Sequence, residues 1–428
     1  SVSFVNSGLL TAIVNNSGAN ESGTVMVTDQ STGAYGTAPF SYIGYLSKIA
    51  GDWSLGLSWW GGTLPTSGSD VTIANANLLS TAISPVIRKL TILPGASLSL
   101  STGLSSLSTS VVNNFGSLIW LGSGTLSIKE QLNHSEDAIF NAGTGTVRLT
   151  GQGEQKIFSG KPLLVFHNLI MEGAGEKILA EGTDLQANNI TVADGVELNL
   201  THGPHSLRLL GNVNLDGDMK SGSSLFEFAG SGNQELSVRS ADTIALGSLK
   251  LNKTSGSLIL KNSVQVNDSL VMSKGNIQTG TNLLILGTDA QNTGLLFHNR
   301  GLIEGKMRRW YAASQNNGTE TGLFPMGQIV MGLWRNRNVQ LNYTTAPSQG
   351  GHLTVEYKAE PMVGTKIGTQ NIINPENTGG AGFTITNFSN EGYWKIDNEA
   401  GKLIDGEYTI SLNGEGYMLP SGLLEITL

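Results

Sequence analysis

Cysteine is absent from the 428 residues, and charged residues make up only 14% of them. Without cysteine there is no disulfide framework, no thiolate zinc site and no cysteine nucleophile. The charged fraction lies well below the roughly 25% of an average soluble domain. The formal net charge is −8, and no basic stripe interrupts this acidic balance. We therefore expect no nucleic-acid partner.

Long apolar runs are also missing. No stretch is long enough for a membrane-spanning helix, so we expect no membrane insertion. The chain begins SVSFVNSGLL, without the basic region that precedes the apolar part of a signal peptide. It stops at LLEITL in the middle of a strand pattern. We expect a fragment or proteolytic product of a longer exported polypeptide.

Glycine, by contrast, is abundant. It accounts for 56 of the 428 residues, nearly twice the usual share of roughly 7%. Ser, Thr and Asn fill much of the remainder. These side chains suit exposed strands and tight turns, and regular apolar alternation argues against disorder. The composition is typical of an extracellular or cell-surface β-protein.

Aromatic residues divide the chain into three parts. From residue 61 to 309 there is no Tyr and Trp120 is the only Trp, whereas both flanks are rich in these residues. We predict an N-terminal β hairpin and cap region over 1–60, a repetitive middle over 61–300 and a separate domain over 301–428. Near the start, LLTAIV and TVMVTD flank a NNSGANESG turn, which predicts a hairpin or the edge of a preceding domain.

The middle region repeats itself. KLTILPGASLSL (89–100) and NITVADGVELNL (189–200) each carry alternating apolar residues into a turn, at Gly95 and Gly195. A second motif occurs as TGQGEQKI (150–157) and, about 80 residues later, as AGSGNQEL (229–236). Separations of 100 and about 80 share a unit of about 20, the length of one coil of a β-helix.

Stacking such coils would bury a continuous apolar core, which one coil cannot do alone. We predict a right-handed parallel β-helix. A β-sandwich array is the alternative, but it requires two-residue hairpin turns, and only Asp216-Gly217 supplies one in this region. The residues predicted to point inward are Leu90, Ile92, Leu98, Ile190, Val192, Leu198, Leu270 and Met272.

The pattern changes from about residue 301. The strands VQLNYTTA, HLTVEYKAE, GFTITNF, GYWKID and GEYTISL alternate cleanly between Gly, Pro and Asn turns. This pattern predicts an antiparallel β-sandwich-like domain after the β-helix.

Two segments resemble a known family. GDWSLGLSWWGGTLPTSGSDVTIANA (51–76) resembles the opening of large secreted surface proteins of the Bacteroidota, where a W-x-x-G-x-x-W stretch precedes the first strand of a β-helix. GKMRRWYAASQNNGTETGLFPMG (305–327) resembles the link from that helix to the next domain. The resemblance implies an adhesin-like cargo of type IX secretion, but it identifies no ligand.

β-helices include polysaccharide lyases and hydrolases, which place acids on one sheet of adjacent coils. The acids of the middle region are Glu154, Glu172, Glu176, Glu181, Asp184, Asp194, Glu197, Asp216 and Asp218. They mostly occupy turn contexts, and we expect no recurrence at a coil-length spacing. The sequence therefore predicts no catalytic residue.

Metal and cofactor signals are equally weak. His202 and His205 are close together in THGPH, but no third ligand is evident. Asp216 and Asp218 lie outside any repeated calcium motif, and no phosphate loop stands out. We expect neither a metal nor a cofactor.

Three surface features remain. Trp59 and Trp60 are candidates for stacking on sugar rings, or for plugging the open end of the solenoid. A basic cluster lies at the predicted junction between the β-helix and the C-terminal domain, and it consists of Arg300, Lys306, Arg308 and Arg309. It is interpreted as a solvated strand or as a site for an anionic polymer. In the resembling proteins, O-glycosylation often occurs at a Ser or Thr that stands between an Asp and an aliphatic residue. This pattern implies Thr243 and Ser269 as acceptors here.

We expect an extracellular structural or adhesive surface protein that presents a rigid β-solenoid, attached to the cell surface or assembling into fibres. Its partners are expected to be other copies of itself, other surface proteins or a polysaccharide. The alternative is a polysaccharide-degrading enzyme, a β-helix lyase or hydrolase, which a cleft of recurrent acids on one sheet would favour.

Overall fold

The computed structural model divides the chain into two compact units, residues 1–224 and 225–428. It describes residues 2–6, 9–12, 20–28, 33, 35–74, 78–81, 84–100, 106–239, 243–313, 322–360, 392–398 and 407–416. Strands make up most of the described residues, and the coils of the two units number about 11. The predicted all-β class, a parallel β-solenoid with antiparallel sheets in the C-terminal region, is confirmed.

The first unit begins with two antiparallel pairs. β1 (Val2–Asn6) pairs with β2 (Leu9–Ala12), and β3 (Asn20–Thr28) pairs with β4 (Tyr35–Ile43). The predicted hairpin between LLTAIV and TVMVTD is therefore wrong. β3 and β4 pair in one uninterrupted nine-residue register, a longer ladder than the four residues of β2 offer.

Parallel pairing begins at Tyr45, within the segment predicted as a cap. β5 (Tyr45–Leu46) pairs with β7 (Asp70–Ile73), and β6 (Gly51–Asp52) pairs with β8 (Leu78–Thr81). The first coil therefore includes residues that the sequence assigned to the cap. The domain boundaries at residues 60 and 300 remain predictions.

The first unit continues as a stack of parallel coils. Its strands are β9 (Lys89–Ile92), β10 (Ser97–Leu100), β11 (Ser106–Asn114), β12 (Ser117–Trp120), β13 (Thr125–His134), β14 (Ile139–Asn141), β15 (Thr146–Leu149), β16 (Gln155–Ser159), β17 (Leu163–Met171), β18 (Gly175–Leu179), β19 (Asp184–Val192), β20 (Val196–Asn199), β21 (Ser206–Leu209), β22 (Val213–Leu215) and β23 (Asp218–Lys220).

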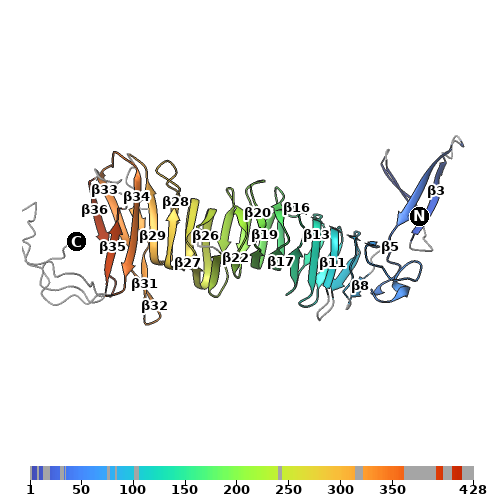
Figure 1. Cartoon of the computed structure of the whole chain (residues 1–428), viewed down its shortest axis with the longest axis horizontal. Helices are drawn as coiled ribbons and strands as arrows, with labels where there is room; N and C mark the ends of the chain where they lie inside the picture. Colours follow the sequence, from blue (N-terminus) through green and yellow to red (C-terminus); the bar gives the residue numbers. More distant parts are fainter. Residues whose placement is uncertain are drawn as a thin grey trace, which may run out of the picture. The chain divides into compact units, whose positions relative to one another are not determined.

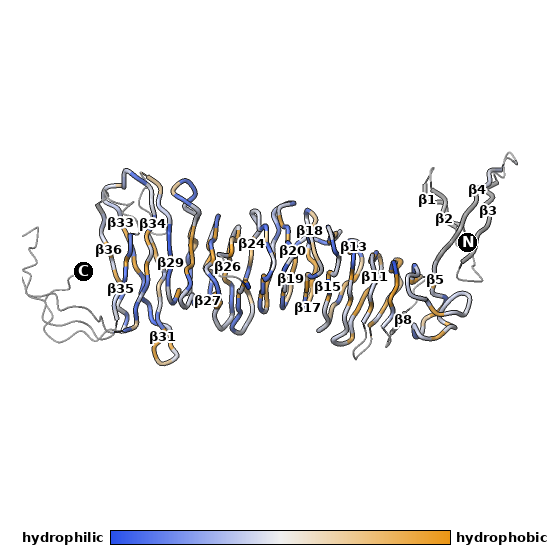
Figure 2. Tube along the Cα trace, in the orientation of Figure 1, coloured by the Kyte–Doolittle hydropathy of each residue, from blue (hydrophilic) through white to orange (hydrophobic). Residues whose placement is uncertain are grey.

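Alternation along these strands creates the core (Figure 2). In a strand, successive side chains point to opposite faces, and β19 shows this as buried Ile190 and Val192 on either side of half-buried Thr191. Ile190 lies between Leu169 of one coil and Val213 of the next. All eight residues predicted to point inward are at most 2% exposed, so the inward assignment is confirmed.

Polar side chains also repeat from coil to coil. Asn189 donates its amide to Asn168 at 2.9 Å, 21 positions earlier. Its carbonyl oxygen accepts the backbone N–H of Asn212 at 2.9 Å, 23 positions later. These separations agree with the predicted unit of about 20 residues.

Glycine turns the chain between the strands of one coil. Gly95 connects β9 to β10 with φ 78°, and Gly195 connects β19 to β20 with φ 79°. Residues with a Cβ rarely adopt this left-handed region. The two repeated segments found in the sequence are therefore equivalent corners of different coils.

The second unit begins with parallel coils and ends in antiparallel sheets. Its strands are β24 (Leu225–Phe228), β25 (Gln234–Val238), β26 (Ile244–Leu260), β27 (Val264–Leu286), β28 (Leu295–His298), β29 (Ile303–Tyr311), β30 (Leu323–Phe324), β31 (Gly327–Val330), β32 (Leu333–Asn336), β33 (Val339–Thr345), β34 (Gly351–Lys358), β35 (Tyr393–Asp397) and β36 (Glu407–Leu412).

β29 is the strand at which the direction of pairing changes (Figure 1). It pairs in parallel with β27 on one edge and antiparallel with β34 on the other. β34 then pairs antiparallel with β35, and β33 with β36. Four of the five alternating C-terminal segments thus form antiparallel strands as predicted, while GFTITNF lies outside the described residues.

Replacing Ile190 by Asp tests the inward assignment. The variant should lose several kcal/mol of unfolding free energy, because it buries a charge without a partner. Thr191→Asp is the matched control, since Thr191 lies next to Ile190 on the outward face of the same strand. Urea denaturation of both variants measures the difference, and equal stability of the two would show that the facing is misassigned.

Candidate functional site

The two tryptophans proposed for sugar stacking differ in how deeply they are buried. Trp59 is 1% exposed, and its indole N–H donates to the Trp53 carbonyl at 2.9 Å. Its ring makes edge contacts with Trp53 and Tyr45, at centroid distances of 4.9 and 6.5 Å. Trp59 thus presents no open ring face to a sugar, because it packs inside the first coil. Trp60 is half-buried, with the Lys48 ammonium 5.3 Å from its ring centroid.

The two proposed glycosylation sites differ in access. Thr243 is exposed, and its preceding Asp lies outside the described residues. Ser269 is half-buried on β27, and its hydroxyl donates to the hydroxyl of Ser248 on β26 at 2.9 Å. A sugar at Ser269 would have to displace this contact between coils. Both sites remain predictions.

Acids do recur at a coil-length spacing, contrary to the expectation from sequence. Glu176 on β18 is in register with Glu197 on β20, which is in register with Asp218 on β23. These residues were predicted to be separate turn acids, but a constant interval of 21 positions separates them in the sequence. The register places one acid on each of three successive coils.

Lys220 binds two members of this acid column. Its ammonium lies 2.6 Å from a Glu197 carboxylate oxygen and 3.3 Å from one of Glu176. Side-chain hydrogen bonding with Glu197, and then with Lys220, lowers the pKa of Glu176 below its ordinary value. The same two carboxylates raise the pKa of Lys220. A general acid requires a raised carboxyl pKa, so these contacts favour a charged structural clamp.

A cavity in the second unit contains an acid of the opposite kind. Its volume is about 360 Å³, and its polar lining includes Glu304, Gln278 and Lys261. Burial raises the pKa of Glu304, which accepts the backbone N–H of Ile329. Among the described residues that line the cavity, Glu304 is the only carboxylate. Glycoside hydrolysis ordinarily uses two.

The repeated glycine-glutamine motif encloses a buried lysine in each unit. In the first copy, Gly151 N–H donates to the Gln155 side chain at 3.1 Å. The Lys177 ammonium donates to the carbonyls of Gly151 and Ala174 at 2.8 and 3.0 Å. Lys177 is 1% exposed, and burial lowers its pKa.

The second copy repeats this arrangement with a lysine from a different position. Gly230 N–H donates to the Gln234 side chain at 2.9 Å. The Lys253 ammonium donates to the Gly230 carbonyl at 3.1 Å and to the Gln234 carbonyl oxygen at 2.6 Å. Burial lowers the pKa of Lys253 to about 8. The motif is visible in the sequence, but the two lysines are not. Each lysine lies on the coil after its glutamine, and the number of residues between glutamine and lysine differs between the two copies.

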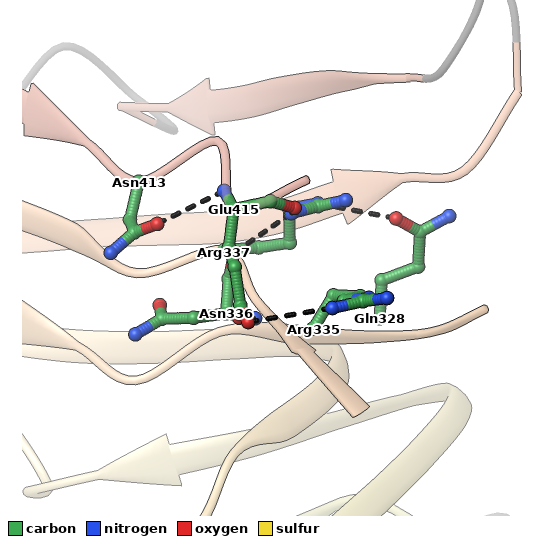
Figure 3. Close-up of polar contacts among 6 residues, drawn as sticks. All are labelled: Gln328, Arg335, Asn336, Arg337, Asn413 and Glu415. Atoms are coloured by element: carbon green, nitrogen blue, oxygen red, sulfur yellow. Dashed lines mark hydrogen bonds and ion pairs between the residues drawn. The ribbon is translucent and has the colours of Figure 1, made fainter. Parts of the chain in front are cut away.

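A buried arginine organises the antiparallel region (Figure 3). Arg337 is 2% exposed. Its guanidinium donates to the Gln328 side chain at 3.1 Å and to the backbone carbonyls of Asn336 and Glu415 at 2.9 and 2.6 Å. These bonds join the β31–β32 hairpin to the segment that follows β36. No sequence motif marked this residue.

One histidine of the THGPH segment and two arginines of the basic cluster make contacts within the fold. His205 is 3% exposed and its Nδ1 lies 2.8 Å from the Thr183 carbonyl. Arg309 is buried and donates to the Leu323 carbonyl at 2.6 Å, and Arg308 donates to the Thr354 hydroxyl at 3.1 Å. The described part of the chain contains no cluster of three or more His, Asp and Glu able to hold a metal ion. It also contains no helix with the length and apolar character needed to cross a membrane.

Comparison with known proteins gives no relative: no family model, no curated protein and no solved structure matches the chain.

Replacing Lys253 by Met tests the burial of its charge. Between pH 8 and 10.5 the unfolded chain keeps a proton that folded Lys253 has lost, so unfolding free energy rises with pH in this window. A pKa lowered to about 8 corresponds to a rise of about 3 kcal/mol. Lys253→Met should lack this rise. Chemical denaturation across the window measures it against wild type.

Exposed Lys274 supplies the control for that experiment. Lys274→Met should retain the rise with pH, since its ammonium is not desolvated on folding. Buried Tyr311 and Tyr343 have raised pKa values and act in the opposite direction above pH 10, so the comparison between variants is made at each pH. An unchanged pH profile in Lys253→Met would contradict the assignment.

Proposed function

We propose that the chain is an extracellular structural or adhesive surface protein, whose function is to present a rigid β-solenoid at or beyond the cell surface. The observation that carries the proposal is that many of the few charged residues form ion pairs between neighbouring coils. Ion pairs repeatedly connect one coil to the next: Arg88–Asp70, Arg148–Glu172, Lys220–Glu197, Lys250–Glu227 and Lys261–Glu235. Each pair supports the register of neighbouring coils.

The chemical state of these charges supports the same proposal. In the best-defined acid column, hydrogen bonding with Glu197 and with Lys220 lowers the pKa of Glu176, and Lys220 lies between the two carboxyl groups. Individual exposed ion pairs are weak, but pairs between coils oppose slippage of one coil over another. A protein that works by maintaining its shape needs this property at every coil.

Secretion and surface attachment extend the proposal through the resemblance of residues 51–76 to Bacteroidota surface proteins. On this view the chain is an adhesin-like cargo of type IX secretion. Its partners are other surface proteins, a polysaccharide or a second copy. β6 is the edge strand of the sheet that also contains β8, β10, β12 and β14, and it is only two residues long. Because short edge strands discourage strand addition, stacking of a second copy onto this edge is less favoured.

A polysaccharide-degrading enzyme is the second candidate. The in-register acids Glu176, Glu197 and Asp218 favour it, because lyases and hydrolases use acids on adjacent strands. The lowered pKa of Glu176 and the Lys220 contacts count against a general acid at this position.

Turnover and attachment assays separate the two functions. The purified protein, incubated with neutral and acidic polysaccharides, should release neither reducing ends nor unsaturated products. It should attach to washed bacterial cells, and deletion of residues 1–43, which stops short of β5, should weaken attachment while circular dichroism still shows a folded β-protein. Product release that is abolished in Glu197→Gln but retained in Glu235→Gln would establish the enzyme instead.

A further inference from the structure

The β31–β32 hairpin has an unusual turn. β31 and β32 form a two-stranded sheet of their own, joined by Met331 and Gly332 with φ 50° and 77°. Two positive φ values are typical of a type I′ turn, which favours Asn-Gly. Met331 is the only non-glycine with positive φ among the described residues. Met331 therefore adopts a backbone conformation that residues other than Gly and Asn rarely adopt.

The side chains of this tip are exposed and apolar. Met331 is 99% exposed and Leu333 is 60% exposed. Ile329 pairs across the strands with Trp334, and Val330 pairs with Leu333. Because adjacent strand residues point to opposite faces, each face of the hairpin carries one of these apolar pairs, and Met331 lies at its end. No charged residue occurs from Ile329 to Trp334.

The root of the hairpin is firmly held (Figure 3). Buried Arg337 ties Gln328 of β31 to the carbonyl of Glu415. The Glu415 carboxylate accepts the backbone N–H of Asn336 at 2.7 Å and lies 3.6 Å from the Arg335 guanidinium. The polar root therefore fixes the direction in which the apolar tip projects from its own unit.

We propose that the hairpin tip, Val330–Leu333, inserts into the interfacial layer of an electrically neutral lipid surface. This interaction goes beyond the proposed function and beyond the expectation of no membrane insertion, which concerned spanning segments. An uncharged tip matches a surface without net charge, and the chain's net charge of −8 disfavours an anionic one.

Three properties favour lipid over a protein groove. A groove would cover one face of the ribbon, whereas this hairpin carries an apolar pair on each face, Val330 with Leu333 and Ile329 with Trp334, and an exposed Met331 at its end. Pairing between Val330 and Leu333 satisfies the backbone groups that lie between the two strands, which lowers the cost of removing them from water. Trp334 and Arg335 follow the tip in sequence, and such residues prefer the boundary between lipid and water.

Vesicle flotation tests the proposal on the full chain. Wild type should float with phosphatidylcholine vesicles. Met331→Asn combined with Leu333→Asn should reduce the bound fraction at least tenfold, while the Asn-Gly turn preserves the hairpin. Leu295→Asn is the matched control, because Leu295 on β28 is also 60% exposed; it should bind as wild type does. Circular dichroism and urea denaturation verify that all variants are folded.

Several results would overturn the proposal. Failure of wild type to float with phosphatidylcholine, or equal flotation of the double variant, excludes insertion of this tip. Flotation that requires anionic lipid excludes a neutral surface as the ligand. Absence of flotation together with self-association that the double variant abolishes in sedimentation would assign the tip to a second copy of the chain.

Discussion

The fold depends on the pairing of each coil with its neighbours. Leu169 shows the arrangement: it is in register with Val147 on one side and Ile190 on the other, and all three are at most 2% exposed. One coil offers its apolar side chains no second layer, so burial exists only in the stack. Register is therefore the property that the remaining side chains must protect.

Corners are where this constraint demands special chemistry. A turn between coils leaves backbone carbonyls facing inward, and a buried carbonyl needs a donor. Lys177 and Lys253 supply that donor to Gly151 and Gly230, although burial lowers the pKa of each lysine. The same logic places Arg337 inside the antiparallel region, where it binds carbonyls that converge from separate strands. Buried cations thus bind inward-facing carbonyls at three places in the fold.

The sequence predicted what is periodic and missed what depends on tertiary register. Alternation identified all eight inward residues, including Ile190, because a half-buried strand has a period of two. It failed for the first hairpin, since β3 has no local signal that its partner is β4 rather than β2. It also missed the column of Glu176, Glu197 and Asp218, because alternation within a strand does not specify which residues of successive coils pair with one another. For Trp59 the sequence left a sugar platform and a packed plug as alternatives, because a tryptophan suits both, and its burial shows that it is packed.

Hydrogen exchange after weakening a single coil tests the dependence on neighbours most directly. Leu169→Ala creates a cavity in β17, a change that typically costs 2–5 kcal/mol or so. If stability passes between adjacent coils, amides of β15 and β19 should exchange faster, while those of β9 and β23 should change less. Equal acceleration throughout the first unit, or acceleration confined to β17, would contradict an account in which each coil is stabilised by the two beside it.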